Sequence, residues 1–519
     1  MASFADLPVE TLLHILRYVS VEDVLTIRQT NKSLGEVTRT RSVWADVLDR
    51  VAFQPNIPVA GLRGRNILSL DASQLEGLAY ATLHLRRNWT SPAPMPTRSL
   101  HLHPSPDSVD HSKVTGLHFI PGRSNRWLLH IGHYVDPIEP LICSTLTCWD
   151  LHANPPARCA SIDYEPERMS WSIILVNSDA EHLAAFVVSR GAFVRSTESE
   201  IHTYIAYGVN ENYDNNPTSE PFRILSQYPS SSHPRAFHGN MLFFERSDSP
   251  NDLAVQVRHV LTGDIMFLLR VPFDVSDPTS MDDRAKIFLK LAVYDQYIIM
   301  FRTRRILMYL IPTESYANGP KHVDPIDVYQ WQWRIDSIEY SIPKTPRSDS
   351  SGSTYLVHRR PPPITLLVRF DSYYPWPVNL LHHFILRPNE LFQQSDIHPT
   401  KHNLPYILQP QTIATLASPM RMFTESDMVV GPYGTALWMD AQTDPDPTQA
   451  GDHGQRIATR MLSKNTGQPV YEDVTRVLQI CETENLWSRL AMDEEEGKVA
   501  IGHKDGTVTL LDYGRLGSQ

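Results

Sequence analysis

The chain has 519 residues, which is enough for two or three domains, and its 41% hydrophobic and 20% charged residues are typical of a globular protein. Its net charge of −11 argues against nucleic acid as a main partner, because phosphate binding requires clustered Lys and Arg side chains. No run of about 18 apolar residues predicts a membrane span. The four cysteines lack the paired spacing of a zinc site. We therefore expect a cytoplasmic or nuclear protein that binds no cofactor, no nucleic acid and no membrane.

Residues 4–48 predict three short helices with more apolar surface than so small a unit can bury by itself. Asp6 is placed to cap the first helix, with Pro8 in its first turn. One face of this helix is apolar, with residues recurring at i, i+3, i+4 and i+7: Leu12, Ile15, Leu16 and Val19.

The second and third helices follow from their capping residues. Ser20, with Asp23 three residues later, resembles a capping box, and Ser42 is placed to cap a third helix that carries Trp44. Apolar residues on two faces indicate that one face packs internally and the other meets a partner.

This pattern resembles the F-box, the helical motif that docks onto the Skp-type adaptor of cullin–RING ubiquitin ligases. The residues that match in order and spacing are Leu7, Pro8, Glu10, Leu13, Ile15, Leu16, Val19, Asp23, Val24, Leu25 and Trp44. Val19 and Val24 stand where leucine is commoner, and Thr30-Asn31 where the family often has a cysteine. The resemblance implies an F-box-like domain over residues 1–50.

The resemblance also implies an apolar helix-packing contact with the adaptor. The residues expected to carry it are Leu7, Pro8, Leu13, Ile15, Leu16, Val24 and Leu25. Spacing alone leaves open which of them face the adaptor and which face the internal core.

Residues 51–96 predict a connector with one helix. Ser73 and Glu76 form a capping box, apolar residues then recur at helical spacing to about residue 88, and the proline-rich stretch 91–96 ends the helix. This helix either sets the orientation of the N-terminal helices relative to the rest of the chain or simply packs; the two interpretations are compatible.

Residues 97–519 predict an all-β domain. Short apolar runs alternate with turn residues, and more than 400 residues are too many for one sandwich, which favours a propeller. Residues 146–151 end in Trp-Asp and residues 498–513 read as a hairpin around Asp505-Gly506, so the region resembles a degenerate WD-like propeller. About seven blades are expected, near 114–163, 169–226, 235–272, 286–331, 333–388, 410–462 and 484–514. The strand 98–102 is expected to complete the last blade and close the ring.

Catalytic and metal-binding patterns are weak. The sequence contains neither the Gly-x-Ser-x-Gly nor the His-Glu-x-x-His motif. Its histidine groups, such as His382-His383, are interpreted as packed or surface residues and not as metal ligands. The acidic run 493–496 predicts a solvated turn. Arg304-Arg305 and Arg359-Arg360 predict solvated strand ends, with partner contacts as the second interpretation. Trp331 and Trp333 favour core packing, with partner binding as the open alternative.

The pairing of an F-box-like domain with a propeller indicates a non-enzymatic substrate-recognition subunit of an SCF-type ubiquitin ligase. It would bind the Skp-type adaptor and through it the cullin, while the propeller captures an unidentified protein substrate. The alternative is a propeller scaffold that never joins a ligase. A propeller hydrolase or lectin would need convergent acids or aromatic residues, and the sequence offers no such constellation.

Overall fold

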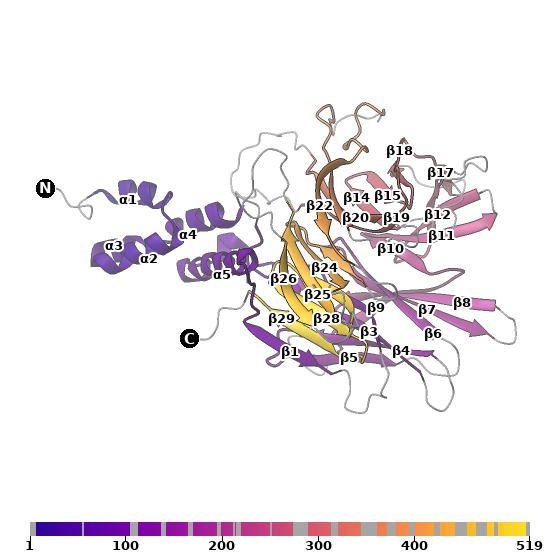
Figure 1. Cartoon of the computed structure of the whole chain (residues 1–519), viewed down its shortest axis with the longest axis horizontal. Coiled ribbons are helices and arrows are strands. Elements are labelled where there is room, and N and C mark those ends of the chain that lie inside the picture. The colour runs from indigo at the N-terminus through magenta and orange to yellow at the C-terminus, as the bar shows by residue number, and fades with distance from the viewer. Residues whose placement is uncertain are drawn as a thin grey trace, which may run out of the picture.

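The computed structural model covers the whole chain, and its described part contains every element discussed below. The described residues are 7–53, 57–103, 113–135, 142–163, 170–194, 199–210, 213, 220–249, 252–272, 289–312, 320–343, 361–370, 380–393, 400–419, 426–441, 454–462, 475–481 and 486–514. Within them, an N-terminal group of helices projects from a larger β-structure (Figure 1).

Residues 7–53, called the helical module below, contain four α-helices where the sequence predicted three. They are α1 (Val9–Leu16), α2 (Val21–Thr30), α3 (Lys32–Val37) and α4 (Arg41–Leu48), and a π-helical turn, η2 (Asp49–Phe53), follows. The Ser20 side chain accepts a hydrogen bond from the backbone N–H of Asp23, so the predicted cap of α2 is confirmed.

Three details of the helical prediction were wrong or fall outside the described residues. Pro8 occupies the N-cap position of α1 and not its first turn, and Asp6 lies outside the described residues. The N-cap of α4 is Thr40 and not Ser42. The unpredicted α3 begins where the Asn31 side chain accepts from the N–H of Ser33, which lets the chain start a new helix directly after α2.

The connector holds a short 3-10 turn, η3 (Ile67–Ser69), and one long helix, α5 (Ala72–Thr90). The capping box of α5 lies two residues before the predicted one: Asp71 accepts from the N–H of Gln74, whose side chain accepts from the N–H of Asp71. Asp71 caps the helix in place of Ser73 because its carboxylate accepts at the helix N-terminus, where negative charge is favoured.

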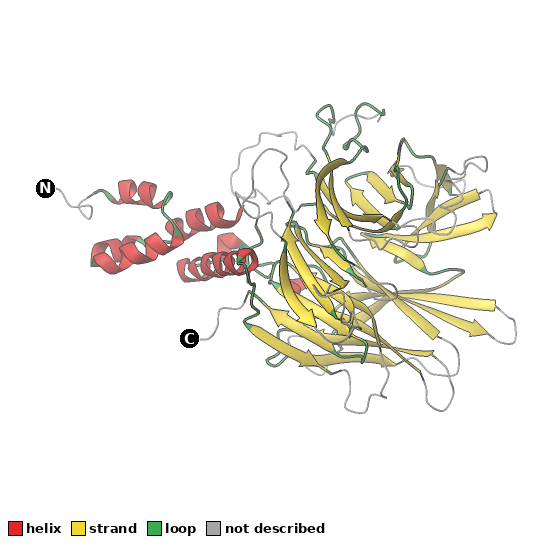
Figure 2. Cartoon of the chain, in the orientation of Figure 1, coloured by secondary structure: helices red, strands yellow, loops and turns green. Residues whose placement is uncertain are grey.

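The strands of the described residues form seven sheets arranged as a propeller (Figure 2). The first three are β2–β5 (Lys113–Phe119, Trp127–Val135, Ile142–Asp150, Ala157–Asp163), β6–β9 (Ser170–Val176, Ala184–Val194, Ser199–Val209, Phe222–Ser230) and β10–β13 (Pro234–His238, Met241–Ser249, Asp252–His259, Ile265–Arg270). The third sheet gains β17 (Lys321–Val323), which pairs in parallel with β13.

The remaining four sheets complete the ring. They are β14, β15, β16 and β18 (Lys290–Tyr294, Tyr297–Phe301, Arg305–Leu310, Asp327–Gln330), β19–β22 (Ile335–Ser341, Ile364–Phe370, Leu380–Leu386, Gln411–Ala417), β23–β26 (Met428–Val430, Thr435–Ala441, Gln455–Met461, Arg476–Cys481) and β27–β29 (Trp487–Asp493, Lys498–His503, Val508–Asp512) with β1 (Arg98–Leu102).

The ring is closed by the strand that the sequence predicted. β1 pairs antiparallel with β29, Arg98 opposite Asp512 and Leu102 opposite Val508, so the seventh sheet joins the two ends of the propeller. The innermost strands contact one another in succession from β2 through β6, β10, β14, β19 and β23 to β27, which in turn contacts β2. The predicted fold, N-terminal helices followed by a seven-bladed β-propeller, is confirmed.

Two predicted blade assignments were wrong. Residues 321–323 were assigned to the fourth blade, but β17 pairs with β13 of the third. Residues 410–417 were assigned to the sixth blade, but β22 pairs antiparallel with β21 and completes the fifth. An insertion between these two strands, held by the bridge between Pro388 and Tyr406, separates β22 from its blade in the sequence. It also supplies Leu404, Tyr406 and Leu408 to the core, which explains its apolar residues.

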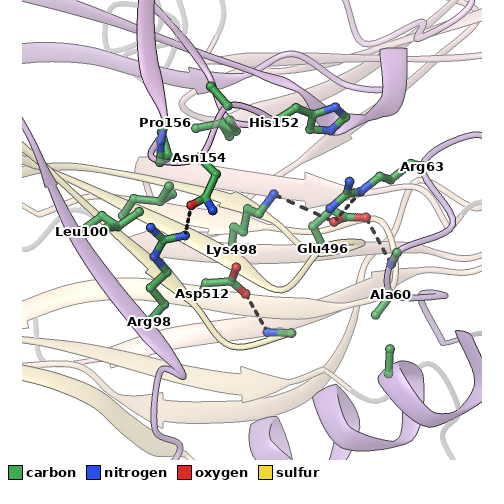
Figure 3. Close-up of a pocket in the computed structure, with 16 residues that line it drawn as sticks. Ala60, Arg63, Arg98, Leu100, His152, Asn154, Pro156, Glu496, Lys498 and Asp512 are labelled. Carbon is green, nitrogen blue, oxygen red and sulfur yellow. Dashed lines mark hydrogen bonds and ion pairs between the residues drawn. The ribbon is translucent and has the colours of Figure 1, made fainter. Parts of the chain in front are cut away.

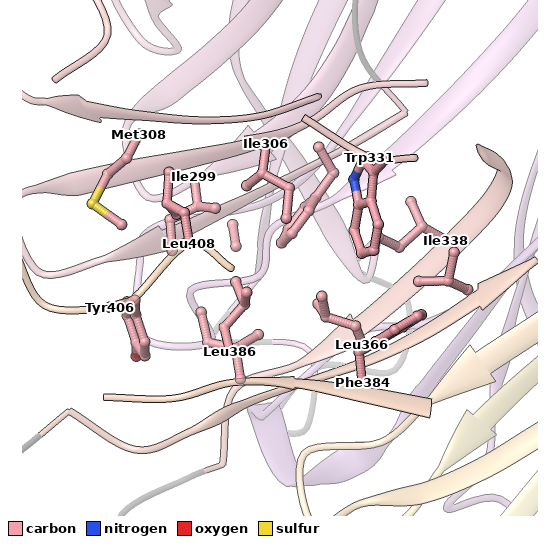
Figure 4. Close-up of a cluster of buried hydrophobic side chains, with 14 of the residues drawn as sticks. Ile299, Ile306, Met308, Trp331, Ile338, Leu366, Phe384, Leu386, Tyr406 and Leu408 are labelled. Carbon is pink, nitrogen blue, oxygen red and sulfur yellow. The ribbon is translucent and has the colours of Figure 1, made fainter. Parts of the chain in front are cut away.

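Each junction between neighbouring blades has its own apolar cluster. Figure 4 shows the cluster between the fourth and fifth blades, where Ile299 and Ile306 face Leu366 and Leu386, with Trp331 at one end. Burial between the faces of successive sheets is the main source of propeller stability, because each sheet alone would leave both faces in water.

Candidate functional site

The helical module has an apolar core that divides the seven predicted adaptor-binding residues. Leu16 and Val24 are buried in the core beside Trp44 and Val47. Leu7, Leu13 and Leu25 are half-buried against it, Ile15 is half-buried, and Pro8 is exposed. The structure therefore brings these residues together, but it places two of them where no partner can touch them.

The outer surface of α1 carries more apolar area than the prediction included. Val9 is 50% exposed and Tyr18, just after the helix, is 77% exposed. Tyr18 is not among the predicted contact residues, although an aromatic residue beside an apolar helix can indicate a contact surface. Ion pairing of Arg17 with Asp46 at 2.8 Å holds the end of α1 against α4.

Partly buried polar contacts tie the helical module to the connector and to the first half of α5. Arg28 makes two hydrogen bonds to the Glu76 carboxylate, at 2.8 and 2.9 Å. Within the module, the Trp44 indole N–H donates to the carbonyl of Thr38 at 2.9 Å. Arg41 donates to the Leu70 carbonyl. Leu75, Leu78 and Ala79 of α5 belong to the same apolar core as the module, so the module and this helix form one packed unit.

The second half of α5 packs into the propeller. Leu85 and Trp89 are buried in the cluster between the sixth and seventh blades, and Trp89 stacks on Tyr513 with ring centroids 4.9 Å apart. Gly497, with φ +67°, has no room for a side chain, because a Cβ there would lie 2.4 Å from Cδ1 of Leu85. One helix therefore spans both units and fixes their relative orientation, since each end is buried in a different core.

The acidic run 493–496, called the acidic loop below, enters the predicted turn, but the prediction that it is solvated is wrong. Asp493, Glu494 and Glu496 are 8%, 3% and 7% exposed. Glu494 accepts from the backbone N–H groups of Tyr433 and Thr435, at 2.6 and 2.7 Å, in the neighbouring blade. Buried carboxylates persist only where such donors replace water.

The other carboxylates of the acidic loop reach two further parts of the chain. Glu496 accepts from the N–H of Gly61 at 3.1 Å and from Nε of Arg63 at 3.2 Å, both in the connector. Asp493 and Glu495 accept from the Asn125 side chain of the first blade, at 3.2 and 3.1 Å. The loop thus joins the sixth, seventh and first blades to the connector.

Burial raises the pKa of Asp493 to about 7, against the opposing effect of Lys498. Between pH 3.8 and about 7 the folded protein holds a proton on Asp493 that the unfolded chain releases, so the contribution of this group to stability falls as the pH rises through that window. Asp493→Asn is expected to remove this decline when denaturant midpoints are compared at pH 5 and pH 8. An unchanged decline in the variant would assign it to other groups.

The remaining residues named in the sequence analysis belong to the propeller and differ in their exposure to solvent. Trp331 is buried between blades, as predicted, whereas Trp333 is 58% exposed. Arg305 was predicted to be solvated but is buried, and its Nη1 donates to the Pro272 carbonyl at 2.9 Å. His383 is buried in the fifth blade. Arg359-Arg360 lie outside the described residues.

Charged side chains line a cavity at the inner strands of blades four to six. Lys290 of β14 pairs with Glu339 of β19 at 2.6 Å, and Asp427, which directly precedes β23, accepts from the N–H of Leu490 at 2.9 Å. The cavity has a volume of about 230 Å³. Burial raises the pKa of Asp427. These residues form a polar patch at the ring centre.

The described residues contain no group of three His, Cys, Asp or Glu side chains arranged to hold a metal ion. Within the same ranges, no helix is long and apolar enough to cross a membrane.

Comparison with known proteins identifies the helical module. Residues 4–50 match the family model described as F-box-like. No curated protein matches the chain significantly. The chain combines an F-box-like domain at its N-terminus with a seven-bladed β-propeller.

Proposed function

We propose that this protein is the substrate-recognition subunit of an SCF-type cullin–RING ubiquitin ligase. The observation that carries the proposal is a single packed helix, α5, that joins an F-box-like module to a propeller. In this role the protein does no chemistry; it raises the local concentration of a protein target near a ubiquitin-loaded conjugating enzyme.

The adaptor-binding residues divide into two roles in this proposal. Pro8 and Ile15, with Leu7, Leu13 and Leu25, contact the Skp-type adaptor through their exposed parts. Leu16 and Val24 act through the core by holding α1 and α2 in place, because their side chains are 3% and 0% exposed. Val9 and Tyr18 extend the adaptor surface at α1.

The target-binding end is assigned to the propeller. In Figure 1 α1–α3 lie at the end of the molecule farthest from the blades, so an adaptor on α1 and a target on the ring can bind at the same time. The charged cavity beside Lys290, Glu339 and Asp427 is the candidate contact for polar groups of the target.

Reconstitution tests the assembly directly. The full chain, co-expressed with a Skp-type adaptor and a cullin, is expected to elute with both as one complex in size-exclusion chromatography. Elution with the adaptor but without the cullin would favour the scaffold that acts outside a ligase. Elution without the adaptor would contradict the proposed function.

A further inference from the structure

A cavity of about 320 Å³ lies where the connector, the first blade and the seventh blade meet. We call it the junction cavity. Ala60 and Ala81 line it from the connector side, Leu151 from the first blade and Leu100 and Leu510 from the seventh. Its volume falls in the range of small-molecule sites, about 300–1,000 Å³. The apolar lining would bury the body of a compact ligand.

The charged lining of the junction cavity is unbalanced. Arg63, Arg98 and Lys498 carry three positive charges, and Glu496 and Asp512 carry two negative charges, which leaves a formal excess of one positive charge. In the view of Figure 3, Lys498 lies between Arg98 on one side and Arg63 on the other. His152 also lines the cavity, and burial lowers its pKa, so it adds no charge at neutral pH.

Lys498 is the buried cation of this set. Its side chain is 8% exposed, and its nearest anionic atom, Oε2 of Glu496, lies at 3.9 Å, beyond hydrogen-bond distance. The same carboxylate is already engaged by the N–H of Gly61 and by Nε of Arg63. The ammonium group therefore has no carboxylate of the described residues within hydrogen-bond distance, and a ligand carboxylate in the cavity would supply one.

Arg98 provides a second donor at the edge of the same cavity. Its Nη1 donates to Oδ1 of Asn154 at 3.2 Å, which fixes the guanidinium and leaves further N–H groups of the fork. A carboxylate accepts from an ammonium and a guanidinium together more strongly than from a neutral donor.

We propose that the junction cavity binds a ligand with one carboxylate on a small apolar body. The carboxylate pairs with Lys498 and Arg98, and the apolar body lies against Leu100, Leu151 and Leu510. Because the walls come from both the connector and the propeller, binding also strengthens the contact that orients the F-box-like module. A free organic acid and the C-terminal residue of a peptide both carry a carboxylate on a small apolar body.

Thermal shift and calorimetric titration of the full chain test this site with defined probes. The probes are 4-phenylbutyrate and the peptide Gly-Gly-Leu-Phe, each as the free acid and as the primary amide. We expect the acids to raise Tm at millimolar concentration and the amides to have little effect, because only the acids supply the anion. The acid that binds more tightly, small molecule or peptide, identifies the source.

Two variants connect the binding to the cavity. Lys498→Met is expected to weaken acid binding about tenfold or more, since it removes a charged hydrogen bond. Ala153→Phe, which changes no charge, is expected to weaken it by filling the space, and this keeps the test valid if the Lys498 variant folds poorly. The matched control is Lys504→Met, an exposed lysine at the turn of the same hairpin.

Equal affinity for acids and amides, no binding of any probe, or full binding by Ala153→Phe would overturn the proposal. None of these measurements requires the adaptor, so the result is independent of the proposed ligase function.

Discussion

Replacing Ile15 by glutamate is expected to abolish co-purification of the Skp-type adaptor with this protein. Ile15 is half-buried on α1 and is absent from the side chains that pack on the module's core, so its outward part is available to a partner. An adaptor contact there would bury the new carboxylate without a counter-charge, and burying an unpaired charge costs several kcal/mol. We expect the folded module to tolerate the change with a loss of about 1 kcal/mol, as for a partly exposed position.

The matched control is Ser33→Glu, which adds the same carboxylate to the helical module. Ser33 is exposed in the first turn of α3, where negative charge is tolerated, and none of the residues assigned to the adaptor contact lies on α3. It should leave adaptor recovery close to that of the unaltered protein. Adaptor recovery by the Ile15 variant at the unaltered level, with circular dichroism unchanged, would rule out this face of α1 as the contact.

Glu494→Ala is expected to lower the free energy of unfolding of the propeller by about 4 kcal/mol. The variant leaves the N–H groups of Tyr433 and Thr435 buried without an acceptor, at about 1–3 kcal/mol each. The packing around the carboxylate is close, since a Cβ on Gly431 would lie 2.2 Å from Oε2 of Glu494. Denaturant unfolding followed by tryptophan fluorescence measures the change.

Two further variants separate this effect from a general loss of charge. Glu494→Gln keeps one acceptor oxygen, so we expect roughly half of the destabilisation. Glu220→Ala removes an exposed carboxylate from the second blade and should change stability by less than about 0.5 kcal/mol. Equal stability of the Glu494→Ala and Glu220→Ala proteins would mean that the acidic loop is not a structural junction.

Local patterns in the sequence predicted the fold well, because the elements that carry it are regular. Apolar spacing located α1, α2 and α4, and the Asp505-Gly506 hairpin together with strand 98–102 predicted the closed seventh sheet. The sequence predicts a positive φ at both Asp505 and Gly506, and this is wrong for Asp505. Of the two, Gly506 alone has a positive φ, and the Asp505 side chain accepts from the N–H of Thr507. The six residues of α3 were too few to show a period.

What the sequence could not show depends on contacts between distant residues. Glu494 and Glu496 look like solvent-exposed charges until their partners are known, and those partners lie 59 to 61 residues and more than 400 residues away. The roles of Ile15 and Leu16 could not be separated for the same reason, since both lie on one apolar stripe and only the position of Trp44 and its neighbours decides which is covered.

The closing strand gives the protein an order of assembly. β1 leaves the ribosome early but finds its partner, β29, only when residue 512 has been made, and Trp89 likewise waits for Tyr513. Until then the helix that holds the F-box-like module has a bare apolar end at Leu85 and Trp89. A chain cut short before Trp487 would therefore carry its module on an unanchored helix with exposed apolar surface. Such a product is a target for chaperones and proteases, so this geometry favours chains in which the ring is complete.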